Sequence, residues 1–126
     1  MKKLKFAVPI YDIDVVLLQV EGKDDEEAVI EEMAQYNITD EIEEEVRNAI
    51  SGDHSDGAST FWNGGLHVSV IVFYRMESMK RKRVCYFHEK RHLEDRILRF
   101  CDIDDMEAAA YLAGFLSEYF DDLLLK

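Results

Sequence analysis

Cysteine, proline and long apolar segments are scarce in this sequence, and each scarcity excludes a class of protein. The two cysteines, Cys85 and Cys101, are too few for a disulfide framework and indicate reduced thiols in a cytoplasmic protein. No apolar run approaches the roughly 20 residues that span a bilayer, so we expect no membrane segment. The single proline and the six glycines mark no linker, which favours one domain over residues 1–126.

Acidic residues are abundant, and the two signs of charge lie in different parts of the chain. The formal net charge is −12, which argues against nucleic-acid binding by the whole domain because phosphate contacts need positive surface. Fourteen of the 27 acidic residues lie within 21–56, and eight of the 15 basic residues lie within 80–99. This asymmetry could steer an anionic partner to the second half, or let the two halves pack against each other, and we favour the second explanation.

Hydrophobic periodicity predicts an α+β fold with a small antiparallel sheet, acidic helices and a C-terminal helix pair. The expected strands cover residues 3–20 with a break at Pro9, 59–62 and 66–75, and the expected helices cover 23–36, 40–50, 78–101 and 102–125. Asn63-Gly64-Gly65 is expected to join the last two strands as a hairpin. Phe61 and Trp62 are expected to form a core aromatic pair. The last helix is apolar nearly all round, which predicts that it is the most buried one.

The segment "CYFHEKRHLEDRIL" contains His88-Glu89-Lys90-Arg91-His92, a match to H-E-x-x-H. Two histidines four apart on a helix project about 40° from each other and can hold one zinc ion at ~2.0–2.1 Å each. Glu89 then lies beside the ion, where it can take a proton from the attacking water. A solvent-exposed charged face would show the same pattern, because His88 and His92 lie almost opposite the apolar side chains of this helix. Periodicity leaves both interpretations open.

A catalytic zinc site needs a third protein ligand, and several residues could supply it. The candidates are Asp95, Asp104, Asp105 and Glu107 downstream and His54 and His67 upstream. We favour other roles for the two upstream histidines, and for Asp95 an ion pair with Arg99. If the turn after the motif helix centres near Phe100, Glu107 returns to within about one turn of His92, whereas a turn centred near Asp102 leaves it roughly 7 Å away. Glu107 fits a ligand or a capping box at the helix start equally well on geometry.

The opening strand "MKKLKFAVPIY", "HEKRH" and "EAAAYLAGFL" together resemble a group of small zincin-like metallopeptidases encoded by phages and mobile elements. The acidic middle section matches nothing in that group. The resemblance implies a zincin-like (gluzincin-like) fold, a zinc cofactor and Glu107 as the third ligand. Lys90 and Arg91 depart from the family pattern, since positive charge inside the motif disfavours a divalent cation.

These observations predict zinc-dependent peptide hydrolysis, of full or weakened activity, with Glu89 as general base and His88, His92 and Glu107 as metal ligands. The strand "LHVSVIVFY" is expected to bind extended peptide by strand addition. The alternative is a non-catalytic acidic interaction protein of a mobile element that binds a basic partner. Nucleic-acid contact through the basic cluster within 80–99 is a weaker third option.

Overall fold

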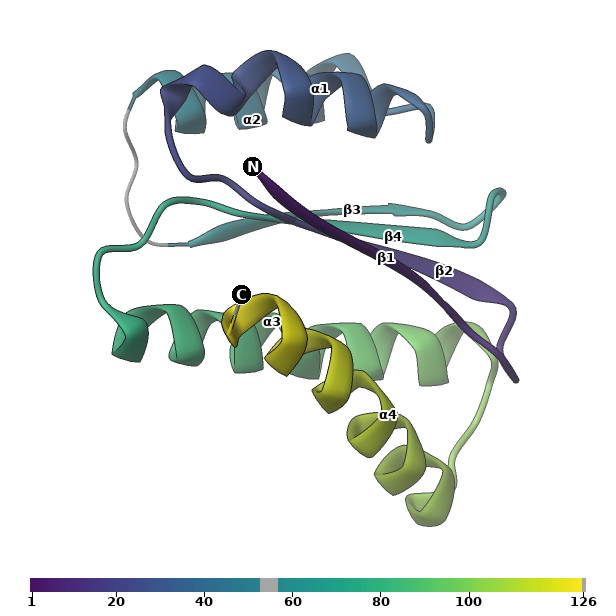
Figure 1. Ribbon diagram of the computed structural model, residues 1–126. Coiled ribbons are helices and arrows are strands. Elements are labelled where there is room, and N and C mark those ends of the chain that lie inside the picture. Colours follow the sequence, from purple (N-terminus) through teal and green to yellow (C-terminus); the bar gives the residue numbers. More distant parts are fainter. Residues whose placement is uncertain (53–56, 126) are drawn as a thin grey trace.

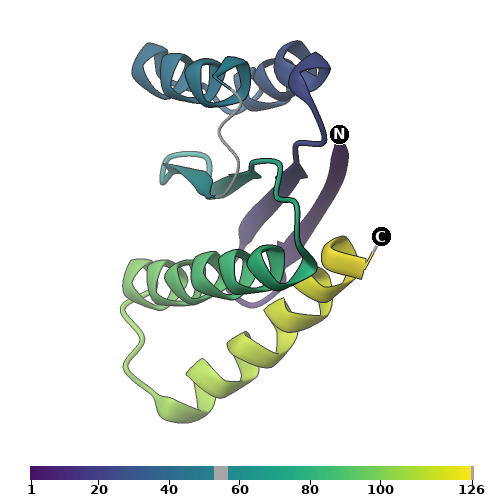
Figure 2. The same cartoon turned by 90° about the vertical axis from the view of Figure 1, so that its left-hand side faces the viewer.

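The computed structural model describes residues 1–52 and 57–125, in which one four-stranded sheet lies between two pairs of helices (Figure 1). The strands are β1 (Lys2–Val8), β2 (Ile13–Gln19), β3 (Ala58–Asn63) and β4 (Val68–Phe73). The helices are α1 (Glu26–Ala34), preceded by the 3-10 turn Lys23–Asp25, α2 (Asp40–Ser51), α3 (Met79–Phe100) and α4 (Met106–Leu125). Helices α1 and α2 cover one face of the sheet, and α3 and α4 cover the other (Figures 1 and 2).

The α+β fold class is confirmed, but the expectation of a wholly antiparallel sheet is wrong. The strand order is β1-β2-β4-β3, and β2 pairs with β4 in parallel, with Leu17 opposite Ile71. The chain between these two strands crosses one face of the sheet through α1 and α2 and then adds β3 at the far edge, so β4 returns in the direction of β2. Strands β2 and β4 are near-continuous apolar runs, a pattern typical of strands buried on both faces.

The local predictions that rested on turn residues are confirmed. Pro9 lies in the turn that separates β1 from β2, and Asn63 ends β3 and leads through Gly64-Gly65 into the connection of the antiparallel β3–β4 hairpin. The helix that carries the motif begins one residue after its N-cap, Ser78, whose Oγ accepts a hydrogen bond from the Arg81 backbone N–H at 3.1 Å. The C-terminal helix pair is therefore present, with the motif near the middle of α3.

Alternating side chains of each strand enter two separate cores. Val70 and Val72 point to the α1/α2 side, whereas Ile71 and Phe73 point to the α3/α4 side. The same alternation separates Phe61, which joins the α1/α2 core, from Trp62, which packs on the α3/α4 side, so the expected aromatic pair is wrong.

The expectation that the second hairpin strand binds a peptide at a free edge is also wrong. Strand β4, which contains most of "LHVSVIVFY", lies inside the sheet with a neighbour on each side, so it offers no free edge to a peptide. Helix α4, expected to be the most buried helix, packs along one stripe that begins at Leu112. Its apolar residues Met106 and Tyr111 are 90% and 78% exposed.

The sheet separates the acidic helices from the basic one. The residues within 21–51 carry twelve acidic and two basic side chains and build the α1/α2 layer, whereas α3 carries eight basic and three acidic side chains on the opposite face (Figure 1). The two halves pair through β2 and β4 within the sheet, but their acidic and basic helices do not pack directly against each other. None of the helices in the described part of the chain is long and apolar enough to cross a membrane.

Candidate active site

Helix α3 is anchored on the sheet by one stripe of side chains, which leaves the motif residues on its flank. Tyr86, Leu93 and Ile97 are buried in the α3/α4 core. The Tyr86 ring stacks on Phe73 at 4.0 Å, and its hydroxyl donates a hydrogen bond to Gln19 Oε1 at 2.5 Å. Because this stripe fixes the rotation of the helix, His88 and His92 project away from the core, as the helical wheel predicts.

The two imidazoles of the motif converge. His88 Nε2 and His92 Nε2 are 3.1 Å apart, and the ring planes are inclined at 80°. Two nitrogens at this separation, each ~2.05 Å from a shared ion, would subtend about 98° at the ion, near the tetrahedral angle that zinc prefers. The same distance suits a hydrogen bond between two neutral rings, one donating and one accepting. The pair therefore fits two ligands of a zinc ion, and both side chains are exposed to solvent.

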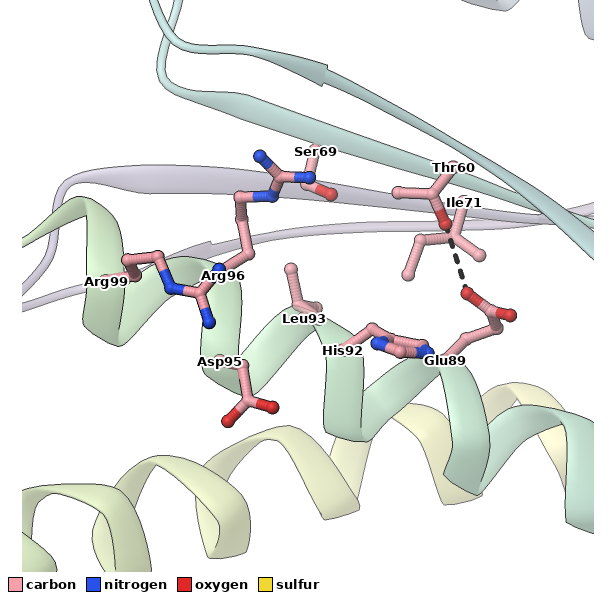
Figure 3. A pocket seen from close by; sticks show the side chains of 9 residues that line it. All are labelled: Thr60, Ser69, Ile71, Glu89, His92, Leu93, Asp95, Arg96 and Arg99. Atoms are coloured by element: carbon pink, nitrogen blue, oxygen red, sulfur yellow. Dashed lines mark hydrogen bonds between the residues drawn. The ribbon is translucent and has the colours of Figure 1, made fainter.

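Glu89 points from α3 towards the edge strand β3. Its Oε2 accepts a hydrogen bond from the Thr60 hydroxyl at 3.2 Å (Figure 3). Glu89 and His92 line a cavity of about 350 Å³ between α3 and the β3–β4 hairpin. Glu89 also lines a second hollow, of about 460 Å³, together with His88. Glu89 therefore lines both hollows, one together with His92 and the other together with His88, and each offers space that a substrate can occupy.

The first cavity is lined by polar and apolar side chains and by charged side chains of both signs. The remaining lining residues are Thr60, Ser69, Ile71, Leu93, Asp95, Arg96 and Arg99. In Figure 3 the Arg96 guanidinium extends towards Ser69, and Glu89 and Thr60 meet at the other end. Ser69 is 1% exposed, and its Oγ has no hydrogen-bond partner among the residues that the structure describes. Sequence reasoning missed Thr60, Ser69 and Arg96, although a serine inside an apolar strand was a visible signal.

The two cations inside the motif are neutralised by neighbours on the same helix. Lys90 points into the protein, where its Nζ lies 2.7 Å from Glu94 Oε2, and both side chains are nearly buried. Arg91 lies 3.5 Å from Glu94 Oε1 and 3.6 Å from Asp95 Oδ1. Asp95 therefore pairs with Arg91, and the expected pairing with Arg99 is not among the ion pairs of the described residues. These contacts weaken the objection that Lys90 and Arg91 repel a metal ion.

The structure does not bring Glu107 to the histidine pair. The helix start is capped by Asp105, whose Oδ1 accepts hydrogen bonds from the backbone N–H groups of Glu107 at 2.8 Å and Ala108 at 3.2 Å. The turn between α3 and α4 centres near Ile103, which places Glu107 level with Arg99, about 10 Å along the axis from His92. Helix α4 also packs beneath β1, on the other flank of α3 from β3 (Figure 2).

The other ligand candidates lie apart from the pair as well. His67 Nδ1 lies 3.1 Å from the Asp12 backbone oxygen, at the far end of the hairpin, and its ring packs on Phe100. His54 falls outside the described residues. Within residues 1–52 and 57–125, no three histidine, cysteine or acidic side chains are grouped so that they could hold a metal ion.

No protein-family profile, curated protein sequence or solved structure matches the chain. The family resemblance of the motif segments therefore stays a prediction, and the geometry of α3 and the adjoining cavity is what bears on function.

Proposed function

We propose that this protein is a zinc-dependent peptidase in which His88 and His92 hold the ion and Glu89 is the general base. The observation that carries the proposal is the convergence of the two Nε2 atoms at 3.1 Å beside a glutamate that lines a cavity. The resemblance to small zincin-like metallopeptidases supports the same assignment and adds Glu107 as the third ligand. In this conformation Glu107 is remote from the histidine pair, and we expect the activity to be weak. The first turn of α4 has no buried side chains, and its movement towards the pair would raise the activity.

Peptide hydrolysis joins the oxygen of a water molecule to the acyl carbon and breaks the C–N bond, and the amine leaves with a proton. Glu89 is the residue positioned to take the proton from the water and return it to the amine. The Thr60 hydroxyl, which donates to Glu89 Oε2, fixes the carboxylate between α3 and β3. When bound, zinc supplies Lewis-acid polarisation of the scissile carbonyl.

The substrate binds along β3 in this proposal. Strand β3 is an edge of the sheet, paired with β4 alone, and Thr60 and Glu89 meet below it. An extended peptide can add to such an edge through backbone hydrogen bonds and pass the glutamate. We place the protein in the cytoplasm, where Cys85 and Cys101 remain thiols, neither being in a disulfide. Nucleic acid and membrane are not among the proposed partners.

The test is a comparison of zinc content and hydrolysis in matched variants. We expect about one zinc per chain by elemental analysis, lost in His88→Ala and in His92→Ala. His67→Asn is the matched control: it removes an imidazole away from the pair, at a positive φ that asparagine tolerates, and should keep the zinc.

The base is tested separately from the metal. Glu89→Gln should retain zinc and lose hydrolysis of a denatured protein by 10²-fold or more, the range for loss of a general base. Unchanged zinc in His88→Ala would contradict the metal site, and hydrolysis that persists in Glu89→Gln would contradict the role of the glutamate.

A second candidate function has its own support in the α1/α2 layer. We infer that this acidic layer would bind a basic partner if the protein is not an enzyme. Arg47 ties Glu26, Glu27 and Glu43 together, with distances of 2.6–3.1 Å, and so neutralises only part of the layer. Glu41 and Glu44 remain exposed on α2. Salt-sensitive binding to polylysine that weakens in Glu41→Gln/Glu44→Gln, with no zinc in the protein, would favour this function over hydrolysis.

A further inference from the structure

We propose that the Arg96–Ser69 end of the cavity binds a carboxylate of the peptide substrate, which is a chain end or an acidic side chain. This inference rests on the proposed peptidase function, because it concerns the substrate of the same site. Its physical basis is an unpartnered buried hydroxyl beside two cations that form no ion pair with a described residue.

The buried hydroxyl is the first observation. On the α3 side of β4, Ser69 takes a position whose neighbours, Ile71 and Phe73, belong to the apolar core. Its side chain is buried and lines the cavity, and its Oγ has no hydrogen-bond partner within residues 1–52 and 57–125. A buried hydroxyl without a hydrogen bond is costly, so a residue of this kind is retained where a ligand can accept or donate.

The two arginines are the second observation. Arg96 and Arg99 both line the cavity, and neither has an ion pair within the part of the chain that the structure describes. The Arg96 guanidinium lies 5.7 Å from the centre of the Trp62 ring, which holds it on the β3 side of α3. A planar guanidinium can donate two parallel hydrogen bonds to a carboxylate, and the Ser69 hydroxyl can donate a third.

The spacing within the cavity predicts which bond is cleaved. Arg96 is seven residues from Glu89 on α3, about 10 Å along the helix axis. On the sheet, Ser69 pairs with Trp62, which is two residues from Thr60. The hydroxyls of Ser69 and Thr60 are therefore separated by about 7 Å along the strand direction. An extended peptide advances about 3.3 Å per residue, so the bond beside Glu89 is two or three residues from the bound carboxylate.

Binding can be tested without hydrolysis, in the metal-free full chain labelled with ¹⁵N. Trp62 is the only tryptophan, so its indole N–H gives a single NMR signal that reports on Arg96 and the cavity. The probes are acetyl-Ala-Ala-Ala with a free carboxylate, the same peptide as its C-terminal amide, acetyl-Ala-Glu-Ala-amide, and inorganic phosphate. We expect the free acid to bind at least tenfold more tightly than the amide.

Variants distinguish binding at Arg96 and Ser69 from non-specific attraction of an anionic peptide to the basic helix α3. Arg96→Gln and Ser69→Ala should each weaken binding of the free acid several-fold or more and leave binding of the amide unchanged. The affinity of Arg96→Lys for the free acid should be intermediate, because lysine keeps the charge but not the planar guanidinium. Arg83→Gln removes the same charge from an exposed position of α3 outside the cavity and should change nothing. An equal effect of Arg83→Gln, equal binding of acid and amide, or tighter binding of phosphate than of the free acid would overturn the proposal.

The outcomes also identify the source of the carboxylate and keep the two proposals apart. Preference for acetyl-Ala-Ala-Ala over acetyl-Ala-Glu-Ala-amide assigns the site to a chain end, and the reverse assigns it to an acidic side chain. Selective binding by a protein that holds no zinc would refute the peptidase proposal alone. Hydrolysis without preference for a carboxylate two or three residues from the cleaved bond would refute the carboxylate site alone.

Discussion

Removal of the Glu94 carboxylate should be one of the most damaging single changes in α3. Its Oε2 lies 2.7 Å from Lys90 Nζ, and the two side chains are 6% and 11% exposed. Glu94→Ala leaves the ammonium group almost buried without its partner, and breaking a buried pair in this way costs 3–5 kcal/mol. Because Lys90 keeps a small exposed fraction and a flexible chain, we expect the lower end, a loss of about 3 kcal/mol in the free energy of unfolding.

The measurement is urea unfolding at neutral pH with a double-mutant cycle. Glu118→Ala, which removes an exposed glutamate from α4, is the control and should change the free energy of unfolding by less than about 0.5 kcal/mol. Lys90→Met/Glu94→Leu should lie near the wild type, because replacing both charges by apolar groups of similar size is often neutral. A loss below about 1 kcal/mol for Glu94→Ala, or a double variant as unstable as the single one, would refute the reasoning.

Three further changes test the cavity floor, the buried network and a helix cap. Ser69→Ala removes an unpartnered buried hydroxyl and should raise the free energy of unfolding by about 1 kcal/mol in urea, whereas a decrease would show that the hydroxyl is satisfied. Tyr86→Phe leaves Gln19 Oε1 without its hydrogen-bond donor and should lower the free energy of unfolding by about 2 kcal/mol. Burial raises the pKa of Tyr86 above its ordinary value of 10, so as the pH rises the unfolded chain loses the phenol proton before the folded chain does. The free energy of unfolding of the wild type should therefore fall as the pH rises above 10, and that of Tyr86→Phe should fall less. Thr39→Ala removes the N-cap hydrogen bond to the Ile42 N–H and should cost about 1 kcal/mol by thermal unfolding, while no change would contradict the cap.

Sequence reasoning succeeded where structure depends on neighbours along the chain. Pro9 separates the first two strands and Asn63-Gly64-Gly65 leads into the hairpin turn, and each acts within a few residues of its own position. The rotation of α3 was also predictable, because the spacing of Tyr86, Leu93 and Ile97 decides which flank carries the histidines. The placement of His88, Glu89 and His92 on one helix follows directly.

Long-range features were not predictable from these patterns. The parallel pairing of β2 with β4 depends on where the chain returns after α1 and α2, which no local pattern encodes. The position of Glu107 depends on the centre of the α3–α4 turn and on which flank of α3 receives α4. The alternation within β3 did predict that Phe61 and Trp62 face opposite ways, and that signal was overlooked.

The charges of α3 act differently at the two ends of the cavity. Near the histidines, Glu94 and Asp95 engage Lys90 and Arg91, the two cations inside the motif. One to two turns further along, Arg96 and Arg99 have no such partner among the described residues. Within the motif the positive charges are thus compensated, whereas the two arginines lie where an anionic group of a substrate would bind. Because unit charges attract or repel more strongly at short range, Lys90 and Arg91 oppose a divalent cation less than bare charges would, and Arg96 and Arg99 favour an anionic peptide.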